Sequence, residues 1–311
     1  MGVDFKIGSL VRENIRKLIP YASARDEFSG SASIFMDANE NPYNAPLNRY
    51  PDPKQVALKE RISALREQQP ERLFLGNGSD EGIDLLFRVL CEPGRDNVIT
   101  VDPTYGMYSV CADINDVQRK SVLLREDFSL DVQAVLDAVD ERTKMIFLCS
   151  PNNPTSNSLE RKAMLELIDE APCMVVVDEA YIDFSEGPGL LSLVPEKKNL
   201  VVLQTLSKAW GLAGIRLGMV FSHPELTGYL TSVKYPYNLN TLSMERAMTE
   251  LDRAGDRTAW VERILSQRER LTRELEGFIF VERVYPSDAN FLLVKTTAPR
   301  EIYSFLVERG I

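Results

Sequence analysis

The chain has 311 residues, of which 44% are apolar and 26% are charged, and its formal net charge is −10. These values are typical of a globular protein with a sizeable core and exclude a disordered, collagen-like or coiled-coil chain. The acidic balance and the lack of a Lys/Arg cluster exclude a duplex-binding protein, so no nucleic-acid partner is expected. No apolar run approaches the roughly 20 residues of a membrane-spanning helix, so no membrane partner is expected.

The metal-binding and thiol residues are few. His223 is the only histidine, which excludes a histidine-rich zinc site, and we expect no metal. The N-terminal segment lacks the apolar core of a secretory signal. The cysteines form no C-x-x-C pair, which also favours a cytoplasmic protein with reduced thiols; they are Cys91, Cys111, Cys149 and Cys173.

Short apolar runs alternate with amphipathic helical patterns through the middle of the chain. Before them, residues 1 to about 45 are polar and irregular, with one helical stretch near Ser9–Leu18. Runs that are apolar throughout indicate strands covered on both faces, and their alternation with helices predicts an α/β fold with a mainly parallel central sheet flanked by helices. The predicted strands are Val98–Val101, Met145–Cys149, Met174–Val177, Leu200–Leu203 and Leu217–Phe221, and the helices between them are Ser79–Leu90, Leu130–Val139 and Leu159–Ile168.

The pattern changes to α+β from about Ser243. A long amphipathic helix over Thr258–Leu275 precedes two strands and a final helix, predicted at Phe278–Val284, Asn290–Val294 and Arg300–Glu308. At roughly 100–200 residues per domain, the length suggests two domains. We predict a large domain over residues 46–245 and a smaller α+β domain made of residues 1–45 plus 246–311. Because Gly310 has the position of a helix C-cap and Ile311 that of a new strand, we expect the small domain to be C-terminally incomplete.

Polar side chains directly follow four of the predicted strands. In open parallel sheets, ligands bind at the carboxyl ends of the strands. We therefore expect an aromatic ring, an amide, a carboxylate with a phenol, and a lysine to share one rim of the sheet. They lie in Asp102–Tyr105, Ser150–Pro154, Asp178–Tyr181 and Gln204–Lys208.

A glycine-rich turn, GNGSDEG at residues 76–82, precedes the first of these helices. Glycines free the backbone, and a helix N-terminus offers unpaired N–H groups to an anion. The G-x-G-x-x-x-G spacing is one residue longer than the dinucleotide-binding fingerprint. Alone, this turn is more often only structural.

Each of these features, taken singly, has an ordinary structural explanation, and the functional hypothesis depends on their joint placement. Pyridoxal phosphate requires a lysine for a Schiff base, a carboxylate opposite its pyridinium nitrogen, an anion site and a ring to stack on. The four strand ends and the glycine turn supply each of these groups. The sequence therefore predicts a pyridoxal-phosphate site.

Seven stretches of the chain resemble histidinol-phosphate aminotransferase, a fold-type-I pyridoxal-phosphate enzyme family of histidine biosynthesis. The resemblance runs almost from end to end. The lysine and DEAY motifs are shared by the wider aminotransferase group, whereas NENPY, RYPDP and GNGSDEGI together indicate the narrower family. The stretches are NENPY (Asn39–Tyr43), RYPDP (Arg49–Pro53), GNGSDEGID (Gly76–Asp84), PTYGMY (Pro103–Tyr108), SPNNPT (Ser150–Thr155), VVVDEAYIDF (Val175–Phe184) and TLSKAWGLAGIRLG (Thr205–Gly218).

The resemblance implies roles for the cofactor residues. Lys208 would be the Schiff-base lysine, and Asp178 would pair with the pyridine nitrogen. Asn153 and Tyr181 would hold the 3-hydroxyl oxygen of the ring, on which Tyr105 would stack. The groups implied for the cofactor phosphate are the amides of Ser79 and Asp80 with the side chains of Ser207 and Arg216.

The resemblance also implies a homodimer and a substrate side. The tyrosine that matches Tyr50 reaches the phosphate of the other subunit in the family. The substrate side would include Tyr21 and the stretch Asn39, Glu40 and Asn41.

Two departures from the family pattern stand out. Ser156 has the place of the usual glycine after NPT, which is costly if that position needs a positive φ. The family continues past Ile311 with a strand that carries a substrate-binding arginine. Without that segment, we expect cofactor binding to survive and transamination to suffer.

Three functions are compatible with these residues. The favoured one is transamination between histidinol phosphate and 2-oxoglutarate, so the partners would be a small phosphorylated amine or amino acid and 2-oxoglutarate. A related aromatic aminotransferase or threonine-phosphate decarboxylase would use the same Lys208 and Asp178. The third is a non-catalytic protein that binds pyridoxal phosphate.

Overall fold

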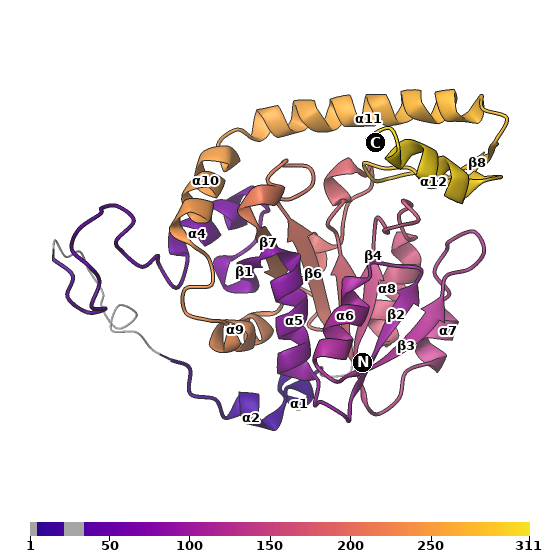
Figure 1. The fold of residues 1–311 in the computed structure, drawn as a ribbon. Coiled ribbons are helices and arrows are strands. Elements are labelled where there is room, and N and C mark those ends of the chain that lie inside the picture. The colour runs from indigo at the N-terminus through magenta and orange to yellow at the C-terminus, as the bar shows by residue number, and fades with distance from the viewer. Residues whose placement is uncertain (1–4, 22–33) are drawn as a thin grey trace.

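A twisted seven-stranded sheet forms the centre of the computed structural model, which describes residues 5–21 and 34–311 (Figure 1). Its strand order is β1-β7-β6-β5-β4-β2-β3. β7 runs antiparallel to both of its neighbours and the other adjacent pairs are parallel, which confirms the predicted fold class. The strands are β1 (Leu73–Asn77), β2 (Asn97–Asp102), β3 (Gln118–Leu123), β4 (Thr143–Cys149), β5 (Met174–Asp178), β6 (Leu200–Thr205) and β7 (Leu217–Phe221).

Helices cover both faces of this sheet, as the uniformly apolar strands require. In β5, Val175 and Val177 belong to one core cluster, whereas Met174 and Val176 belong to the other. The first cluster includes residues of α4 (Val56–Leu65), α7 (Val132–Asp137), α8 (Arg161–Glu170) and α10 (Thr241–Leu251). The second includes residues of α1 (Ile7–Leu10), α5 (Gly78–Leu90), α6 (Met107–Ile114) and α9 (Pro224–Val233).

Short helices complete these layers. They are α2 (Glu13–Arg16) and the single 3-10 turns η1 (Pro70–Arg72), η2 (Ile182–Phe184), η3 (Leu191–Leu193) and η4 (Ala213–Ile215). η2 follows β5 and η4 precedes β7, so both lie beside the polar segments at the strand ends.

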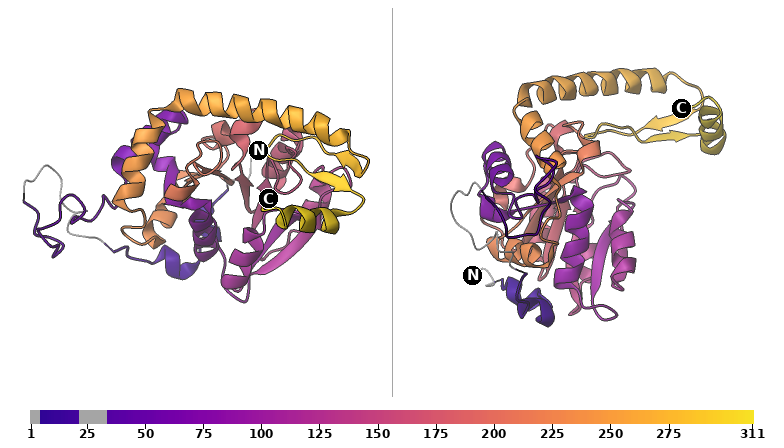
Figure 2. Two further views of the ribbon diagram at one scale, coloured as in Figure 1. Left: turned by 45° about the horizontal axis from the view of Figure 1, so that its top comes forward. Right: turned by 60° about the vertical axis from the view of Figure 1, so that its left-hand side comes forward.

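The C-terminal portion lies across the end of the sheet. α11 (Ala254–Glu276) runs along the top of the molecule, with β8 (Val281–Val284), β9 (Val294–Thr296) and α12 (Pro299–Val307) beside its far end (Figures 1 and 2). β8 and β9 pair antiparallel. The strand predicted at Asn290–Val294 is wrong except for its last residue, because the Ser287 hydroxyl accepts from Ala289 N and donates to Phe291 O and so folds this segment into a turn.

An apolar cluster and an ion-pair network join α11 to the sheet. Val261 of α11 packs with Tyr181 in the apolar cluster that follows β5. Next to it, both carboxylate oxygens of Asp183 accept from Arg66 at 3.1 Å, and Oδ1 also accepts from Arg257 of α11 at 2.8 Å. The carboxylate thus links the C-cap of α4, η2 and α11.

A second link connects the C-terminal hairpin to the loop after β4. The backbone N–H of Asp288 donates to Ser156 O at 2.8 Å, and the Asp288 carboxylate accepts from Ser158 N at 2.8 Å. The Ser156 hydroxyl also donates to Pro286 O at 3.2 Å. Three hydrogen bonds therefore fix the 286–288 segment to this loop.

The predicted division into two domains remains a prediction. All seven strands of the large sheet lie within residues 46–245. Ile7 and Val11, which fall in the predicted small domain, pack instead in the core cluster that contains Leu226 and Leu230 of α9. This part of the N-terminal segment therefore lies against the large sheet.

Candidate active site

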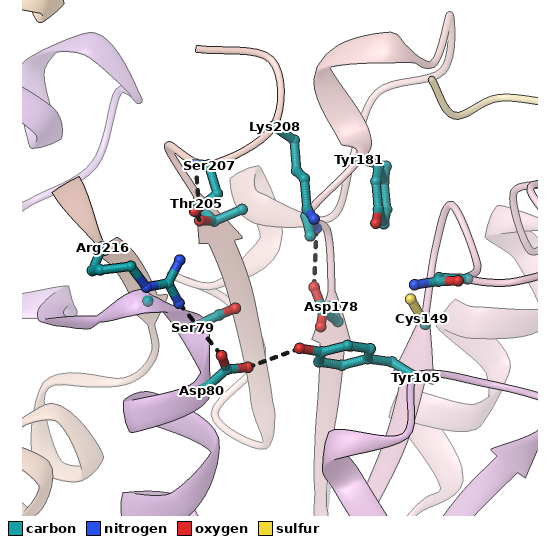
Figure 3. A pocket seen from close by; sticks show the side chains of 13 residues that line it. Ser79, Asp80, Tyr105, Cys149, Asp178, Tyr181, Thr205, Ser207, Lys208 and Arg216 are labelled. Atoms are coloured by element: carbon teal, nitrogen blue, oxygen red, sulfur yellow. Dashed lines mark hydrogen bonds and ion pairs between the residues drawn. The ribbon is translucent and has the colours of Figure 1, made fainter. Parts of the chain in front are cut away.

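A cavity opens at the carboxyl ends of β4, β5 and β6 (Figure 3). The structure brings nine of the ten predicted cofactor-binding residues together in its wall, and Tyr50 is the exception. The lining residues are Gly78, Ser79, Asp80, Tyr105, Cys149, Asn153, Asp178, Ala180, Tyr181, Thr205, Ser207, Lys208 and Arg216.

One wall of the cavity is the N-terminus of α5. Gly78 has φ +73° and begins the helix, and the side chain of the preceding Asn77 makes no cap hydrogen bond. The first turn of a helix has N–H groups without intrahelical partners, so Ser79 and Asp80 present their amides to the cavity. β7 supports this turn at very short range: a Cβ on Gly218 would lie 2.1 Å from the backbone of Gly78 and Ser79.

Arg216 adds a cation to the same wall. It has a left-handed φ of +54°, its carbonyl accepts from Gly78 N at 2.9 Å, and its guanidinium lies 3.6 Å from Asp80 Oδ2. The other oxygen of Asp80 accepts from the Tyr105 hydroxyl at 3.1 Å (Figure 3). Burial and the nearby Asp80 raise the pKa of Tyr105, so this hydroxyl remains a donor.

Ser207 lies beside Arg216 at the end of β6. Its N–H donates to Thr205 Oγ1 at 3.1 Å, and the two hydroxyl oxygens are 3.0 Å apart. These contacts hold the Ser207 hydroxyl at the cavity wall. With the helix N-terminus and the guanidinium it forms a donor set suited to an anion.

Asp178 lies at the floor of the cavity, where β5 ends. The residue is 3% exposed, and burial raises the pKa of its carboxyl to about 6 because the charged form loses hydration. Ala180 N donates to Oδ1 at 3.0 Å and the Tyr108 hydroxyl donates to Oδ2 at 2.9 Å, which favours the charged form. The site therefore holds a poorly hydrated carboxylate in a fixed orientation.

Lys208 extends into the cavity from the segment after β6 (Figure 3). Its Nζ lies 5.2 Å from the centroid of the Tyr181 ring. The Tyr181 ring in turn packs edge-on against Phe291, with 5.2 Å between ring centroids. An amine, a buried carboxylate and an anion cradle thus surround one cavity.

Comparison with known proteins decides the family. The family described as aminotransferase class I and II matches residues 35–311. A histidinol-phosphate aminotransferase of Parabacteroides distasonis is 53% identical over 97% of this chain and 88% of its own length. The chain belongs to the histidinol-phosphate aminotransferase family.

Solved structures of this aminotransferase family share the fold. The histidinol-phosphate aminotransferase of Sinorhizobium meliloti, solved in complex with pyridoxal-5'-phosphate, has a TM-score of 0.78 at 21% identity, over 88% of this chain and 80% of that one. The enzyme of Clostridium acetobutylicum has a TM-score of 0.76 at 22% identity, over 85% and 80% of the two chains.

The loop that carries Asn153 in this family member is shaped by its neighbours. The buried amide of Asn152 donates to Pro103 O at 2.9 Å and to Thr155 Oγ1 at 2.7 Å. Ser156, at the usual glycine position of the aminotransferase family, has φ +67° and is fully buried. The position therefore does adopt the left-handed conformation, and the hydroxyl bonds to Thr155 O and Pro286 O hold the serine there.

The predicted substrate residues and Tyr50 lie outside the cavity. They belong to the N-terminal segment, of which residues 34–50 lie to the side of the sheet at the left of Figure 1. Glu40 bonds within this segment, since its carboxylate accepts from Tyr50 N at 2.6 Å and from Arg49 at 2.7 Å. The roles proposed for Tyr21, Asn39, Glu40 and Asn41 in substrate binding, and for Tyr50 in phosphate binding, remain predictions.

Sequence reasoning assigned no role to five residues of this aminotransferase site, two of which are Gly78 and Ala180 in the cavity wall. Thr205 and Cys149 line the cavity, and Tyr108 holds Asp178 from behind. Their positions at the ends of predicted strands could have indicated Thr205 and Cys149. Tyr108 belongs to the PTYGMY stretch, Pro103–Tyr108, to which only the role of Tyr105 was assigned.

The described ranges 5–21 and 34–311 show no group of three or more His, Cys, Asp or Glu side chains that could hold a metal ion. Within the same ranges, no helix is both long and apolar enough to cross a membrane.

Proposed function

We propose that this chain transfers the amino group of histidinol phosphate to 2-oxoglutarate, with pyridoxal 5'-phosphate as cofactor, giving imidazole-acetol phosphate and glutamate in histidine biosynthesis. The observation that carries the proposal is the cavity of Figure 3, in which Lys208, Asp178 and the N-terminus of α5 converge. The names of the relatives, which are about half identical over nearly the whole chain, support the substrate.

The donor set of the cavity fits the cofactor. The first-turn amides of α5, the Ser207 hydroxyl and the Arg216 guanidinium would hold a phosphate dianion at one end. At the other end, the buried Asp178 carboxylate matches a protonated ring nitrogen, since a buried charge is stable only with a charged partner. Between them, the Tyr105 ring would stack, and the Asn153 and Tyr181 side chains would hold the ring oxygen.

The bound cofactor supplies an electron sink for the negative charge that develops at the substrate Cα. Asp178 would hold a proton at the ring nitrogen, because Tyr108 and Ala180 stabilise the charge of its carboxylate. Lys208 would bind the cofactor at rest; once substrate displaces it, its free amine moves the Cα proton. The Tyr181 hydroxyl and the Asn153 amide would orient the ring beside this amine.

Turnover assays test the proposed reaction. Histidinol phosphate with 2-oxoglutarate should yield glutamate and a product with the mass of imidazole-acetol phosphate. Faster turnover of phenylalanine, or release of CO2 from threonine phosphate, would contradict the proposed substrate. A protein that binds the cofactor but turns over none of these compounds would be a non-catalytic cofactor-binding protein.

Chemical labelling tests the role of Lys208 separately. Borohydride reduction of the cofactor-loaded protein, followed by peptide mapping, should place the label on Lys208. Lys208→Ala should abolish transamination while still binding the cofactor weakly, because the phosphate cradle remains. A label on another lysine would refute the assignment.

We propose that the enzyme is a homodimer in the cytoplasm. The exposed Tyr43, Leu47 and Tyr50 of the N-terminal segment support the dimer, because apolar surface of this kind is typical of protein contacts. The four free, buried cysteines support the location. Mixing inactive Lys208→Ala and Tyr50→Phe chains should restore activity if Tyr50 contributes to the partner's site. In the mixed dimer, one of the two sites then contains a native Lys208 from one chain and a native Tyr50 from the other. Activity that does not reappear in a confirmed mixed dimer would contradict the shared site.

A further inference from the structure

Tyr108 is buried directly behind the cavity. It lies in the first turn of α6, is 0% exposed and does not line the cavity itself. Its ring stacks on Phe147 of β4 with 4.8 Å between centroids and meets Tyr105 edge-on at 5.7 Å. These contacts on two sides leave the hydroxyl a single position.

The hydroxyl of Tyr108 faces Asp178. It donates to Oδ2 at 2.9 Å, and Ala180 N donates to Oδ1 at 3.0 Å from the other side. Each carboxylate oxygen therefore has one donor, so the plane of the carboxylate is fixed. Each oxygen also keeps acceptor capacity, because a carboxylate offers about four lone-pair sites.

Tyr108 is a neutral donor, and this distinguishes it from a salt-bridge partner. Burial and the adjacent Asp178 raise the pKa of the Tyr108 phenol, so it stays protonated. Burial likewise raises the pKa of the neighbouring Cys149 thiol, which stays uncharged. An arginine here would neutralise Asp178, whereas a phenol stabilises its negative charge and leaves that charge available to a partner in the cavity.

We propose that Tyr108 is a positioning residue for Asp178: its hydroxyl keeps the carboxylate ionised and aimed at the ring nitrogen of the cofactor. The inference rests on the proposed function of the cavity. It extends the site by one residue that contacts neither cofactor nor substrate. The titratable groups that surround Asp178 are Tyr108, Cys149, Asp80, Tyr105, Glu179 and Lys208.

The test is Tyr108→Phe in the cofactor-loaded enzyme, with Tyr229→Phe as the control. Tyr229 packs against the same core cluster from α9, away from Asp178. Its variant also loses one tyrosine hydroxyl, which makes it a matched control. The readout is the 15N chemical shift of cofactor labelled at the ring nitrogen, followed over pH. Without the Tyr108 hydrogen bond, Asp178 binds a proton more strongly, so the 15N signal should move toward that of neutral pyridine and the acidic limb of kcat should move to higher pH. We expect kcat to fall about tenfold, the size of one lost hydrogen bond to a charged group.

Each outcome distinguishes this inference from the proposed function. If native protein fails to hold the cofactor at Lys208, both are wrong. If native protein holds it and Tyr108→Phe keeps the 15N shift and pH profile of the Tyr229→Phe control, only the role of Tyr108 is wrong. If Tyr108→Phe does not fold, difluorotyrosine at position 108 replaces it: this more acidic phenol is a stronger donor and should shift the signal toward the protonated nitrogen, and an unchanged signal overturns the inference.

Discussion

Removal of the Asp183 carboxylate should destabilise the protein more than removal of either arginine that binds it. Asp183 accepts three charge-assisted hydrogen bonds, two from Arg66 and one from Arg257. The side chains are largely buried, with 11% of Asp183, 16% of Arg66 and 25% of Arg257 exposed. One carboxylate thus binds two poorly hydrated guanidinium groups.

The charges determine the ranking of the variants. Asp183→Asn removes the carboxylate that both guanidinium groups bind, and removal of one partner from a buried pair costs about 3–5 kcal/mol. Residual exposure places our expectation at the lower end, about 3 kcal/mol. Arg66→Gln or Arg257→Gln leaves the carboxylate with one arginine, so each should cost less, about 1.5 kcal/mol, the lower end for a hydrogen bond to a charged group.

Urea unfolding followed by circular dichroism measures these differences, and a double variant makes the test sharper. In the Asp183→Asn background, Arg257→Gln removes an unpaired charge that repels Arg66. In that background, Arg257→Gln should therefore leave the free energy of unfolding unchanged or raise it. In the native background, the same substitution should lower the free energy of unfolding. Additive losses in the double variant, or an Asp183→Asn cost below about 1 kcal/mol, would refute the reasoning.

Three further predictions concern the site. In cofactor-free protein, Asp178→Asn should raise the free energy of unfolding above pH 6 by up to about 3 kcal/mol. The pKa of Asp178 is about 6 in the folded protein and 3.8 ordinarily, so the native protein loses stability as the pH rises between these values. An equal increase in the free energy of unfolding at pH 3 and pH 7 would contradict this. Gly218→Ala should abolish cofactor binding, measured by absorbance titration, and lower the free energy of unfolding by about 3 kcal/mol, because the new Cβ meets the backbone at Ser79. Normal cofactor affinity would count against phosphate binding at the N-terminus of α5. Ser156→Ala should lower the free energy of unfolding by about 1 kcal/mol, because the hydrogen bond to Pro286 O is lost. Ser156→Gly should stay near the native value, because glycine adopts the positive φ without strain and this offsets the lost bond. A glycine variant less stable in urea than the alanine variant would be inconsistent with the observed backbone.

The interior strands could be predicted from the sequence because they are buried on both faces. The five apolar runs correspond to β2, β4, β5, β6 and β7. β3, at the sheet edge, alternates exposed and half-buried residues and has no apolar run. The antiparallel direction of β7 depends on the path of the segment between β6 and β7, which hydrophobic periodicity does not encode.

Tyr105, Asn153, Asp178, Tyr181 and Lys208 could be placed together because each lies in a segment that follows a predicted strand, and parallel strands end at a common edge. Ser79 and Asp80 lie in the glycine-rich turn, and Arg216 was assigned through the family resemblance. The roles assigned to Lys208 and Asp178 remain predictions, but the structure does bring these side chains into one cavity. Tyr108 could not be predicted in this way, because its contact with Asp178 comes from packing between α6 and β5. The motifs of the N-terminal segment could not be placed from the sequence, because their contacts are non-local: Glu40 accepts from Tyr50 N and Arg49, and the Tyr50 ring stacks on Tyr237 at 4.5 Å.

The two polar links of the C-terminal portion have a mechanical consequence. One joins Arg257, near the start of α11, to Asp183, and the other joins Asp288, beyond β8, to the backbone at Ser156. If these two polar links alone fixed the C-terminal portion, its remaining motion as a rigid body would be rotation about the line that joins them. The apolar cluster around Val261 lies between them, and such contacts are non-directional and tolerate small rotations.

Rotation about this line would move α12 relative to the sheet, because α12 follows the C-terminal hairpin and has no buried residue. The fixed points themselves lie three residues after Asn153 and two residues after Tyr181. These two side chains would therefore stay in place while α12 moves. The same hydrogen bonds that hold the C-terminal portion thus separate its motion from the geometry of the site.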